Sequence, residues 1–237
     1  MIDQPYRITG MKIEYSADNE IANFREICMG SMAGGMLYRG SYPIMSMDPE
    51  RDRAYDRLVK KTKITCVVNL SDNESGLETT ASSLHWYREL LDAGKIIGLD
   101  IRFLFDFDKE DEYGTFKSKL RQAFQFMITH AGPCLIHCNA GTDRTGFLAA
   151  IIEGLFGAEI EDIVYDYLLS HGKEFADDRE NELNFTTGNI IYNQLNTALG
   201  GKIYDKKNFK ENIENYIISE IGLPEIELYR FKKKFTL

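Results

Sequence analysis

The sequence predicts an α/β fold in which a central, mostly parallel sheet of about four to five strands is flanked by helices and followed by a helical C-terminal extension. Short apolar runs of strand length alternate with longer segments of helical spacing through the first two thirds of the chain. Beyond Glu159 only helical patterns remain. Near the middle, a loop of glycine and polar residues joins an apolar strand to an apolar helix, as is typical of ligand sites in open α/β sheets.

The first predicted helix begins at Asp48, because an N-cap residue followed by Pro49 and Glu50 is a strong start signal, and it extends to about Lys61. Residues 64–70 (ITCVVNL) form an apolar run that is typical of a buried strand. The elements predicted next are a turn over 71–74, a helix over about 79–91, a strand over 101–107 and a helix over 115–130.

The second half of the chain contains one further strand and then only helices. The predicted elements are a strand over 133–138 and helices over 147–156, 159–170, 209–220 and from Leu223 onward. The basic cluster Arg230–Lys234 is expected to be a solvated helix end that complements the helix dipole. Because no repeat or linker divides the chain, we predict a single domain over 1–237, with a core of about 20–172 and the extension over about 173–237.

Composition limits the partners and the compartment. The chain has 237 residues and a formal net charge of −9, which argues against nucleic acid and anionic membranes as partners. No apolar run is long enough to span a membrane, and the N-terminus does not resemble a signal peptide. Four cysteines in a chain of this length do not make a disulfide framework. We therefore expect a cytoplasmic protein, and the sequence leaves its oligomeric state open.

The chemistry of the chain is concentrated in residues 137–146, which read HCNAGTDRTG. Cys138 and Arg144 are separated by five residues in a loop between a strand and a helix N-terminus, where backbone amides and the helix dipole form an anion site. A cysteine at the mouth of that site is expected to be a thiolate nucleophile, and Arg144 can grip two oxygens of a phosphoryl group. The residues alone therefore predict hydrolysis of a phosphate ester.

The loop supplies the other candidate residues of the site. Thr145 is expected to donate a hydrogen bond to the Cys138 thiolate when that thiolate is released in the second step of hydrolysis. His137 either orients the loop or is a buried core histidine. Neither a metal ion nor a cofactor is expected, because Cys134, His137 and Cys138 lie on one strand without a partner cluster. Phosphate binding is assigned to Asn139, Ala140, Gly141, Thr142, Asp143 and Arg144.

Residues 137–146 resemble the signature loop of the cysteine-dependent protein tyrosine phosphatase superfamily. The stretches 23–26 (NFRE), 37–41 (LYRGS), 166–170 (DYLLS) and 220–223 (EIGL) are similar to a bacterial branch whose members include tyrosine and dual-specificity (triple-specificity-like) phosphatases. The resemblance implies the cysteine phosphatase fold and metal-independent hydrolysis through a phosphocysteine on Cys138. It implies a phosphorylated protein or a small phosphomonoester as substrate.

The resemblance also implies an aspartic general acid on a loop after an earlier strand. Residues 106–114 (DFDKEDEYG) offer Asp106, Asp108 and Asp111 without the usual Trp-Pro-Asp, and alignment from the strand end favours Asp108. Asp143, inside the signature loop, is an equal candidate, since some relatives are thought to use that aspartate. The alternatives are a solvated acidic loop for residues 106–114 and a loop-holding salt bridge for Asp143.

The substrate is predicted from what the loop lacks. Lipid and inositol-phosphate phosphatases of the superfamily often carry lysine where this chain has Asn139 and Thr142, so we predict a monophosphate, most readily protein phosphotyrosine. A phosphoinositide or dual-specificity phosphatase and a phosphate-binding pseudophosphatase are the alternatives. Arg25 and Arg39 either restore positive charge over the site or form salt bridges. Cys66 is either a disulfide partner of Cys138 or a buried strand residue.

Overall fold

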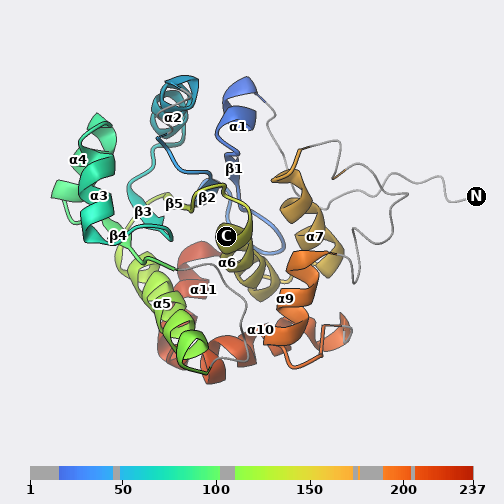
Figure 1. Cartoon of the computed structure of the whole chain (residues 1–237). Coiled ribbons are helices and arrows are strands. Elements are labelled where there is room, and N and C mark those ends of the chain that lie inside the picture. Colours follow the sequence, from blue (N-terminus) through green and yellow to red (C-terminus); the bar gives the residue numbers. More distant parts are fainter. Residues whose placement is uncertain are drawn as a thin grey trace, which may run out of the picture.

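The computed structural model describes residues 16–44, 49–101, 110–172, 176, 189–203 and 206–236, with the side chains of residues 110, 111 and 206 outside that description. Its centre is a five-stranded sheet in the order β1-β2-β5-β3-β4 (Figure 1). Strand β1 pairs antiparallel with β2, whereas the other neighbours are parallel. The predicted α/β class is thus confirmed. The strands are β1 (Arg25–Glu26), β2 (Leu37–Gly40), β3 (Cys66–Asn69), β4 (Ile96–Gly98) and β5 (Cys134–His137).

Helices surround the sheet. In the described part of the chain they are α1 (Ala17–Ile21), α2 (Pro49–Thr62), α3 (Glu74–Ala81), α4 (His85–Asp92), α5 (Glu110–Thr129), α6 (Asp143–Leu155), α7 (Ile160–Leu169), α9 (Ile190–Ala198), α10 (Phe209–Asn215) and α11 (Glu225–Phe235). A 3-10 turn η2 (Lys206–Asn208) precedes α10, and a π-helical turn η3 (Tyr216–Glu220) follows it. No described helix is long and apolar enough to cross a lipid bilayer.

The two faces of the sheet bury different helices, because successive strand residues point to opposite sides. Val67 and Leu135 face a core that also contains Tyr55 of α2, Leu77 of α3 and Tyr87 of α4. The opposite face carries the larger core, to which α5, α6, α7, α9, α10 and α11 contribute. Both faces of the central strands are therefore buried against helices, which explains their continuous apolar sequence.

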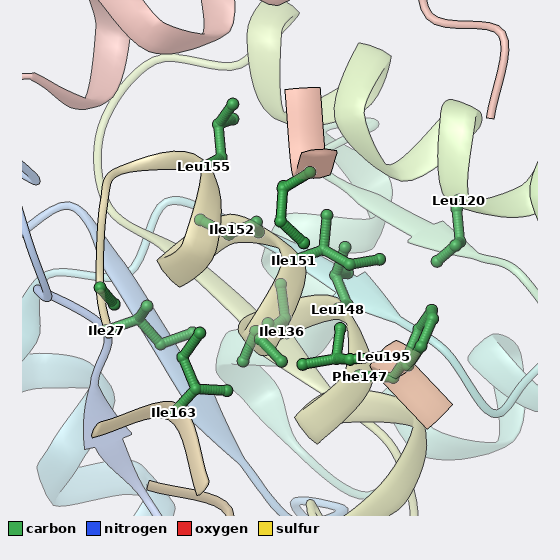
Figure 2. Packing of buried hydrophobic residues seen from close by; sticks show 14 of the residues in the cluster. Ile27, Leu120, Ile136, Phe147, Leu148, Ile151, Ile152, Leu155, Ile163 and Leu195 are labelled. Atoms are coloured by element: carbon green, nitrogen blue, oxygen red, sulfur yellow. The ribbon is translucent and has the colours of Figure 1, made fainter. Parts of the chain in front are cut away.

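Helix α6 is the centre of the larger core (Figure 2). It contacts β2 and β5 on one side and α7, α9 and α10 on the others, and every side chain from Thr145 to Leu155 is buried. Its sequence, FLAAIIEGL after Gly146, is apolar all round for this reason. The helix that starts at the signature loop is consequently held on all sides by protein.

The C-terminal helices belong to the same core. Helix α11 packs against α5, and Phe231 and Phe235 are fully buried. Lys234 donates hydrogen bonds to the carbonyls of Met127 and His130 at the end of α5, and Lys232 pairs with Glu214 at 2.6 Å. The basic cluster is thus part of the packing between α11 and its neighbours, as well as the last turn of α11.

Several sequence predictions differ from the structure in their bounds. The helix predicted over 79–91 is divided into α3 and α4, because α3 begins earlier, capped by Asn73, and ends at Ala81. Strand β4 was not predicted, and the helix predicted over 209–220 changes from α10 to a π-helical turn at Tyr216. The strand predicted over 101–107 lies outside the described residues except for Ile101, which is not in a strand.

One acidic residue lies inside the apolar α6. Glu153 is 1% exposed, and neither carboxylate oxygen has a hydrogen-bond partner among the residues that the structure describes. Burial, reinforced by the negative charge of Asp166, raises the pKa of Glu153 well above its ordinary value. A raised pKa means that the unfolded chain releases this proton more readily than the folded chain does.

The free energy of unfolding of Glu153→Gln, relative to that of the natural chain, is therefore predicted to increase as pH rises. The folded protein must hold a proton on Glu153 above its usual pKa, so the natural chain loses stability with rising pH while the glutamine does not titrate. Urea unfolding at about pH 5 and about pH 8 measures the effect. Glu225→Gln, an exposed change on α11, is the control. An advantage of Glu153→Gln that shrinks with rising pH would contradict the prediction.

Candidate active site

The signature loop (residues 138–144) joins the C-terminal end of β5 to the start of α6. Strand β5 lies in the middle of the sheet, between β2 and β3, and Cys138 follows it directly with 2% of its surface exposed. Helix α6 begins at Asp143, so its positive end points into the loop. The predicted position of the loop at the C-terminal end of a central strand is confirmed.

The carbonyl groups of residues 139–142 are bound from the β1–β2 side or by α6 itself. The acceptor and donor pairs are Asn139 O with Tyr42 N (2.8 Å), Ala140 O with Asn23 Nδ2 (2.9 Å), Gly141 O with Arg39 Nη2 (2.8 Å) and Thr142 O with Gly146 N (2.7 Å). In contrast, no described residue accepts a hydrogen bond from the backbone amides of residues 139–144. In a trans peptide the N–H of one residue points opposite to the C=O of the residue before it, so the amides of residues 140–142, which follow the bound carbonyls of residues 139–141, face away from β2.

Close backbone contact holds the loop against β2. Gly141 has φ +75°, and a Cβ atom there would lie 2.5 Å from the carbonyl oxygen of Gly40 and 2.8 Å from the amide nitrogen of Ser41. Only glycine satisfies both the left-handed backbone and this contact. The glycine inside the predicted motif is therefore required by the geometry.

Arg144 links the loop to the segment that carries the predicted acid. Its Nη1 donates a 2.9 Å hydrogen bond to the carbonyl of Ile101, the last described residue before 102–109. Asp106 and Asp108 lie outside the described residues, as does the side chain of Asp111. The guanidinium thus contacts the backbone five residues before Asp106.

Asp143 is held by a tyrosine of α7. Tyr167 Oη donates to Asp143 Oδ1 at 2.8 Å, where a salt bridge within the loop was one expectation. Burial, followed by the neighbouring carboxylate, raises the pKa of Tyr167, so the phenol keeps its proton at neutral pH. Asp143 is therefore positioned at the first turn of α6 by a neutral donor.

His137, directly before Cys138 in the sequence, and Thr145, in the first turn of α6, are both fully buried. The Thr145 hydroxyl has no hydrogen-bond partner within the described chain, so it is available to a group in the site. His137 packs between the rings of Tyr42 and Tyr87, with centroid distances of 5.6 and 6.4 Å. Burial lowers its pKa to about 4, and a contact with the backbone of Cys138 acts in the opposite direction, so His137 is a buried core histidine that also lies against the backbone of the loop.

Two sequence hypotheses about residues near the loop were settled by register and orientation. Cys66 pairs in register with Cys134 at the start of the strands, roughly 13 Å of strand length from Cys138, so a disulfide between Cys66 and Cys138 is wrong. Arg25 and Arg39 form salt bridges with Asp166 on α7 and do not lie over the site as added charge. The described residues contain no group of three or more side chains suited to a metal ion.

A polar network beside the loop was missed from the sequence. Asp72 accepts hydrogen bonds from Tyr42 Oη at 2.6 Å and from Asn69 Nδ2 at 2.9 Å, and Asn69 also contacts Tyr87. The network fixes Tyr42, whose amide binds the loop. The available signal was Asn69, a buried polar residue that ends an apolar strand and requires partners.

Gly141→Ala is predicted to reduce both stability and phosphatase activity. The new Cβ meets the backbone of Gly40 and shifts the loop away from β2, in addition to a left-handed strain of roughly 1 kcal/mol. Gly94→Ala is the matched control, because Gly94 has φ +67° with nothing within 4 Å of a Cβ. Thermal melting should show a larger loss of stability in Gly141→Ala than in Gly94→Ala, because the two share only the left-handed strain, and turnover of p-nitrophenyl phosphate should fall in Gly141→Ala alone. Equal turnover in the two would contradict the contact.

His137→Gln is predicted to flatten the acid dependence of stability. The folded pKa of His137 is about 4 against an ordinary 6.5, so an unfolded chain takes up this proton first. The natural chain therefore loses up to about 3 kcal/mol from this residue as pH falls through that window, and glutamine removes the loss. Urea unfolding of both proteins between about pH 7 and about pH 4 tests this, and parallel curves would refute it.

Known proteins are similar to this chain. A putative tyrosine-protein phosphatase of Cupriavidus necator is 29% identical over 178 residues, which cover 65% of this chain and 62% of that protein's length. The solved structure of the Siw14 catalytic core is 19% identical with a TM-score of 0.38, covering 78% of this chain and 96% of that one. The model of the tyrosine phosphatase family matches residues 20–236. The chain therefore belongs to the tyrosine phosphatase family, a family of phosphomonoester hydrolases.

Proposed function

We propose that this chain hydrolyses phosphomonoesters, with protein phosphotyrosine as the substrate, through a phosphocysteine intermediate on Cys138. The observation that carries the proposal is the orientation of the signature loop. The carbonyls of residues 139–141 are bound behind the loop, the amides that follow them face the opposite way, and Cys138 lies at the base of the loop at the positive end of α6. Such an array is built for the negative charge of a phosphoryl group.

In the first step the Cys138 thiolate attacks phosphorus in line with the ester bond. The S–P bond forms as the P–O bond breaks, and an aspartic acid gives its proton to the leaving oxygen. Arg144 and the amides of residues 139–144 bind the equatorial oxygens most strongly in the transition state. In the second step the same aspartate takes a proton from water, which attacks phosphorus and releases inorganic phosphate and the thiolate.

Thr145 assists the second step. Its hydroxyl is buried and has no other partner in the described structure, so it can donate a hydrogen bond to the thiolate as the S–P bond breaks. The proposal keeps Asp108 and Asp143 as the two candidates for the acid. Arg144 contacts the backbone before the segment that carries Asp108, and Tyr167 holds Asp143 at the loop.

A monophosphate is the substrate that the charges favour. Asn139 and Thr142 replace the lysines expected in enzymes for polyphosphorylated lipids, and the net charge of −9 repels polyanions. Arg25 and Arg39 do not compensate, because both are bound to Asp166 behind the loop. The name of the Cupriavidus relative as a tyrosine-protein phosphatase agrees with phosphotyrosine. All four cysteines are unpaired, in keeping with the cytoplasmic location that is part of the proposal.

Turnover of a phosphotyrosine peptide is predicted to be independent of metal and to vanish in Cys138→Ser. The assay compares that peptide with a phosphoserine peptide and a phosphoinositide in the presence of a chelator. Cys28→Ser is the control, because Cys28 lies in the segment beside the far end of α6. Turnover that survives in Cys138→Ser would contradict the mechanism. Preference for the phosphoinositide would mean that a phosphoinositide, and not phosphotyrosine, is the substrate. Phosphopeptide binding without any turnover would indicate a pseudophosphatase.

The general acid is identified by comparing the rate loss of each variant on two substrates whose leaving groups differ in their need for a proton. Loss of the acid is predicted to slow phosphotyrosine hydrolysis by roughly 10²- to 10⁴-fold, and p-nitrophenyl phosphate much less, because nitrophenolate leaves without a proton. Asp108→Asn and Asp143→Asn are measured on both substrates, with Asp106→Asn beside them. The variant with the larger difference between substrates lacks the acid. If none shows a difference, the acid is not one of these aspartates.

A further inference from the structure

Behind the signature loop, two buried arginines share one buried carboxylate. Arg25 Nε lies 2.6 Å from Asp166 Oδ1, and Arg39 Nη1 contacts Asp166 Oδ2. Arg39 is 0% exposed, Asp166 1% and Arg25 7%. Although burial opposes it, the two guanidinium groups hold the pKa of Asp166 below its usual value. Asp166 is thus a buried carboxylate with one arginine on each oxygen.

Both arginines continue from Asp166 to the loop. Arg39 Nη2 donates to the carbonyls of Gly141 at 2.8 Å and Thr142 at 3.4 Å. On the other branch, Arg25 Nη1 donates to Asn23 Oδ1 at 2.8 Å, and Asn23 Nδ2 donates to the carbonyl of Ala140 at 2.9 Å. Three successive carbonyls of the loop, those of residues 140–142, are therefore connected to one carboxylate.

The position of Asp166 is fixed by its own element. Its backbone carbonyl accepts from Arg25 Nη2 at 2.6 Å, and the Ser170 hydroxyl, one turn later in the chain, accepts from Arg25 at 2.8 Å and from Arg39 at 3.2 Å. The Asp166–Ser170 turn at the end of α7 thus determines where both guanidinium groups lie.

Room for this arrangement comes from the last glycine of the motif. A Cβ on Gly146 would lie 2.9 Å from the ring of Tyr167 and 3.4 Å from Arg39 Nη2. The absence of a side chain there lets the guanidinium reach the loop carbonyls from behind α6. Ion pairs at this depth are seldom net stabilising compared with apolar packing, so stability alone does not account for three desolvated charges.

We propose that Asp166, acting through Arg39 and Arg25, is the positioning residue that turns the carbonyls of residues 140–142 away from the site and so aims the following amides at the phosphoryl group. The proposal rests on the proposed function of the loop. Neither arginine touches the substrate in this account. Their contribution is the orientation of three peptide groups. The residue that determines this orientation, Asp166, lies on α7 and not in the loop.

Arg39→Lys tests the orientation directly. Lysine keeps the positive charge beside Asp166, but a single ammonium cannot reproduce the planar fork that joins Asp166 to Gly141 and Thr142. The matched control is Ile163→Ala, a buried change on the same helix α7 that destabilises the protein without touching the loop. Asp166→Asn, which keeps the shape and removes the charge, is the second variant.

The primary readout is the affinity for inorganic phosphate in a Cys138→Ser background, measured by titration of the ¹⁵N amide resonances of residues 139–144. We expect Arg39→Lys and Asp166→Asn to weaken phosphate binding by roughly tenfold or more and to shift the free resonances of residues 141–143. With Cys138 present, both variants should raise KM as well as lower kcat. Ile163→Ala should lower only the folded fraction, so its KM and phosphate affinity should be unchanged.

The outcomes separate this proposal from the proposed function. Should the Cys138→Ser parent bind no phosphate and the natural chain hydrolyse no phosphomonoester, the proposed function fails and the positioning role falls with it. Should the parent bind phosphate while Arg39→Lys and Asp166→Asn bind it as tightly as Ile163→Ala does, the positioning role alone is overturned. The expected result is a loss of affinity in the two polar variants at a melting temperature matched by Ile163→Ala.

Discussion

The candidate site depends on the direction in which the amides and carbonyls of a few peptide groups in the signature loop point. Each peptide carries a donor and an acceptor that point in opposite directions, so a loop can offer its amides to an anion only where its carbonyls are bound elsewhere. Here the donors to the carbonyls of residues 139–141 come from Tyr42, Asn23 and Arg39. The N-terminal part of the chain thus holds a loop whose proposed nucleophile, Cys138, lies more than 90 residues later.

The rest of the fold keeps that loop in place. Strand β5 is paired on both sides by parallel strands, and α6 is buried between the sheet and the helices α7, α9 and α10. A loop between two such elements has little freedom, which suits a site that must hold oriented dipoles before the substrate arrives. Helices α9 and α10 therefore contribute to the site by covering α6, whereas α7 also supplies Tyr167, which donates a hydrogen bond to Asp143 in the loop.

Much of the fold could be predicted from the sequence because its central elements are buried on all sides. Continuous apolar runs identified β3, β5 and α6, and the residues between Cys138 and Arg144 predicted the anion site that we propose. Strand β4 was missed because three residues after Lys95 are too short for any periodicity. The break between α3 and α4 was missed because serines are compatible with both a helix and a turn.

The direction of charged side chains could not be predicted. Arg25 and Arg39 are positive in the sequence, but whether they face the substrate or the back of the loop depends on Asp166, which lies 141 residues after Arg25 and 127 after Arg39. The pairing of Cys66 with Cys134 likewise depends on strand register, which the sequence does not specify for strands buried on both faces. Both features are tertiary, and local patterns carry no information about them.

We propose that the loop binds a phosphoryl group and that the sulfur of Cys138 accepts this group from the substrate. Rapid acid quenching of the natural chain during turnover of a phosphotyrosine peptide, followed by mass spectrometry of the peptide that contains Cys138, tests it most directly. The account predicts a phosphoryl adduct on Cys138 that appears within the first turnover and is absent from Cys28, Cys66 and Cys134. Turnover without any adduct on Cys138, when the quench is faster than one catalytic cycle, would contradict it.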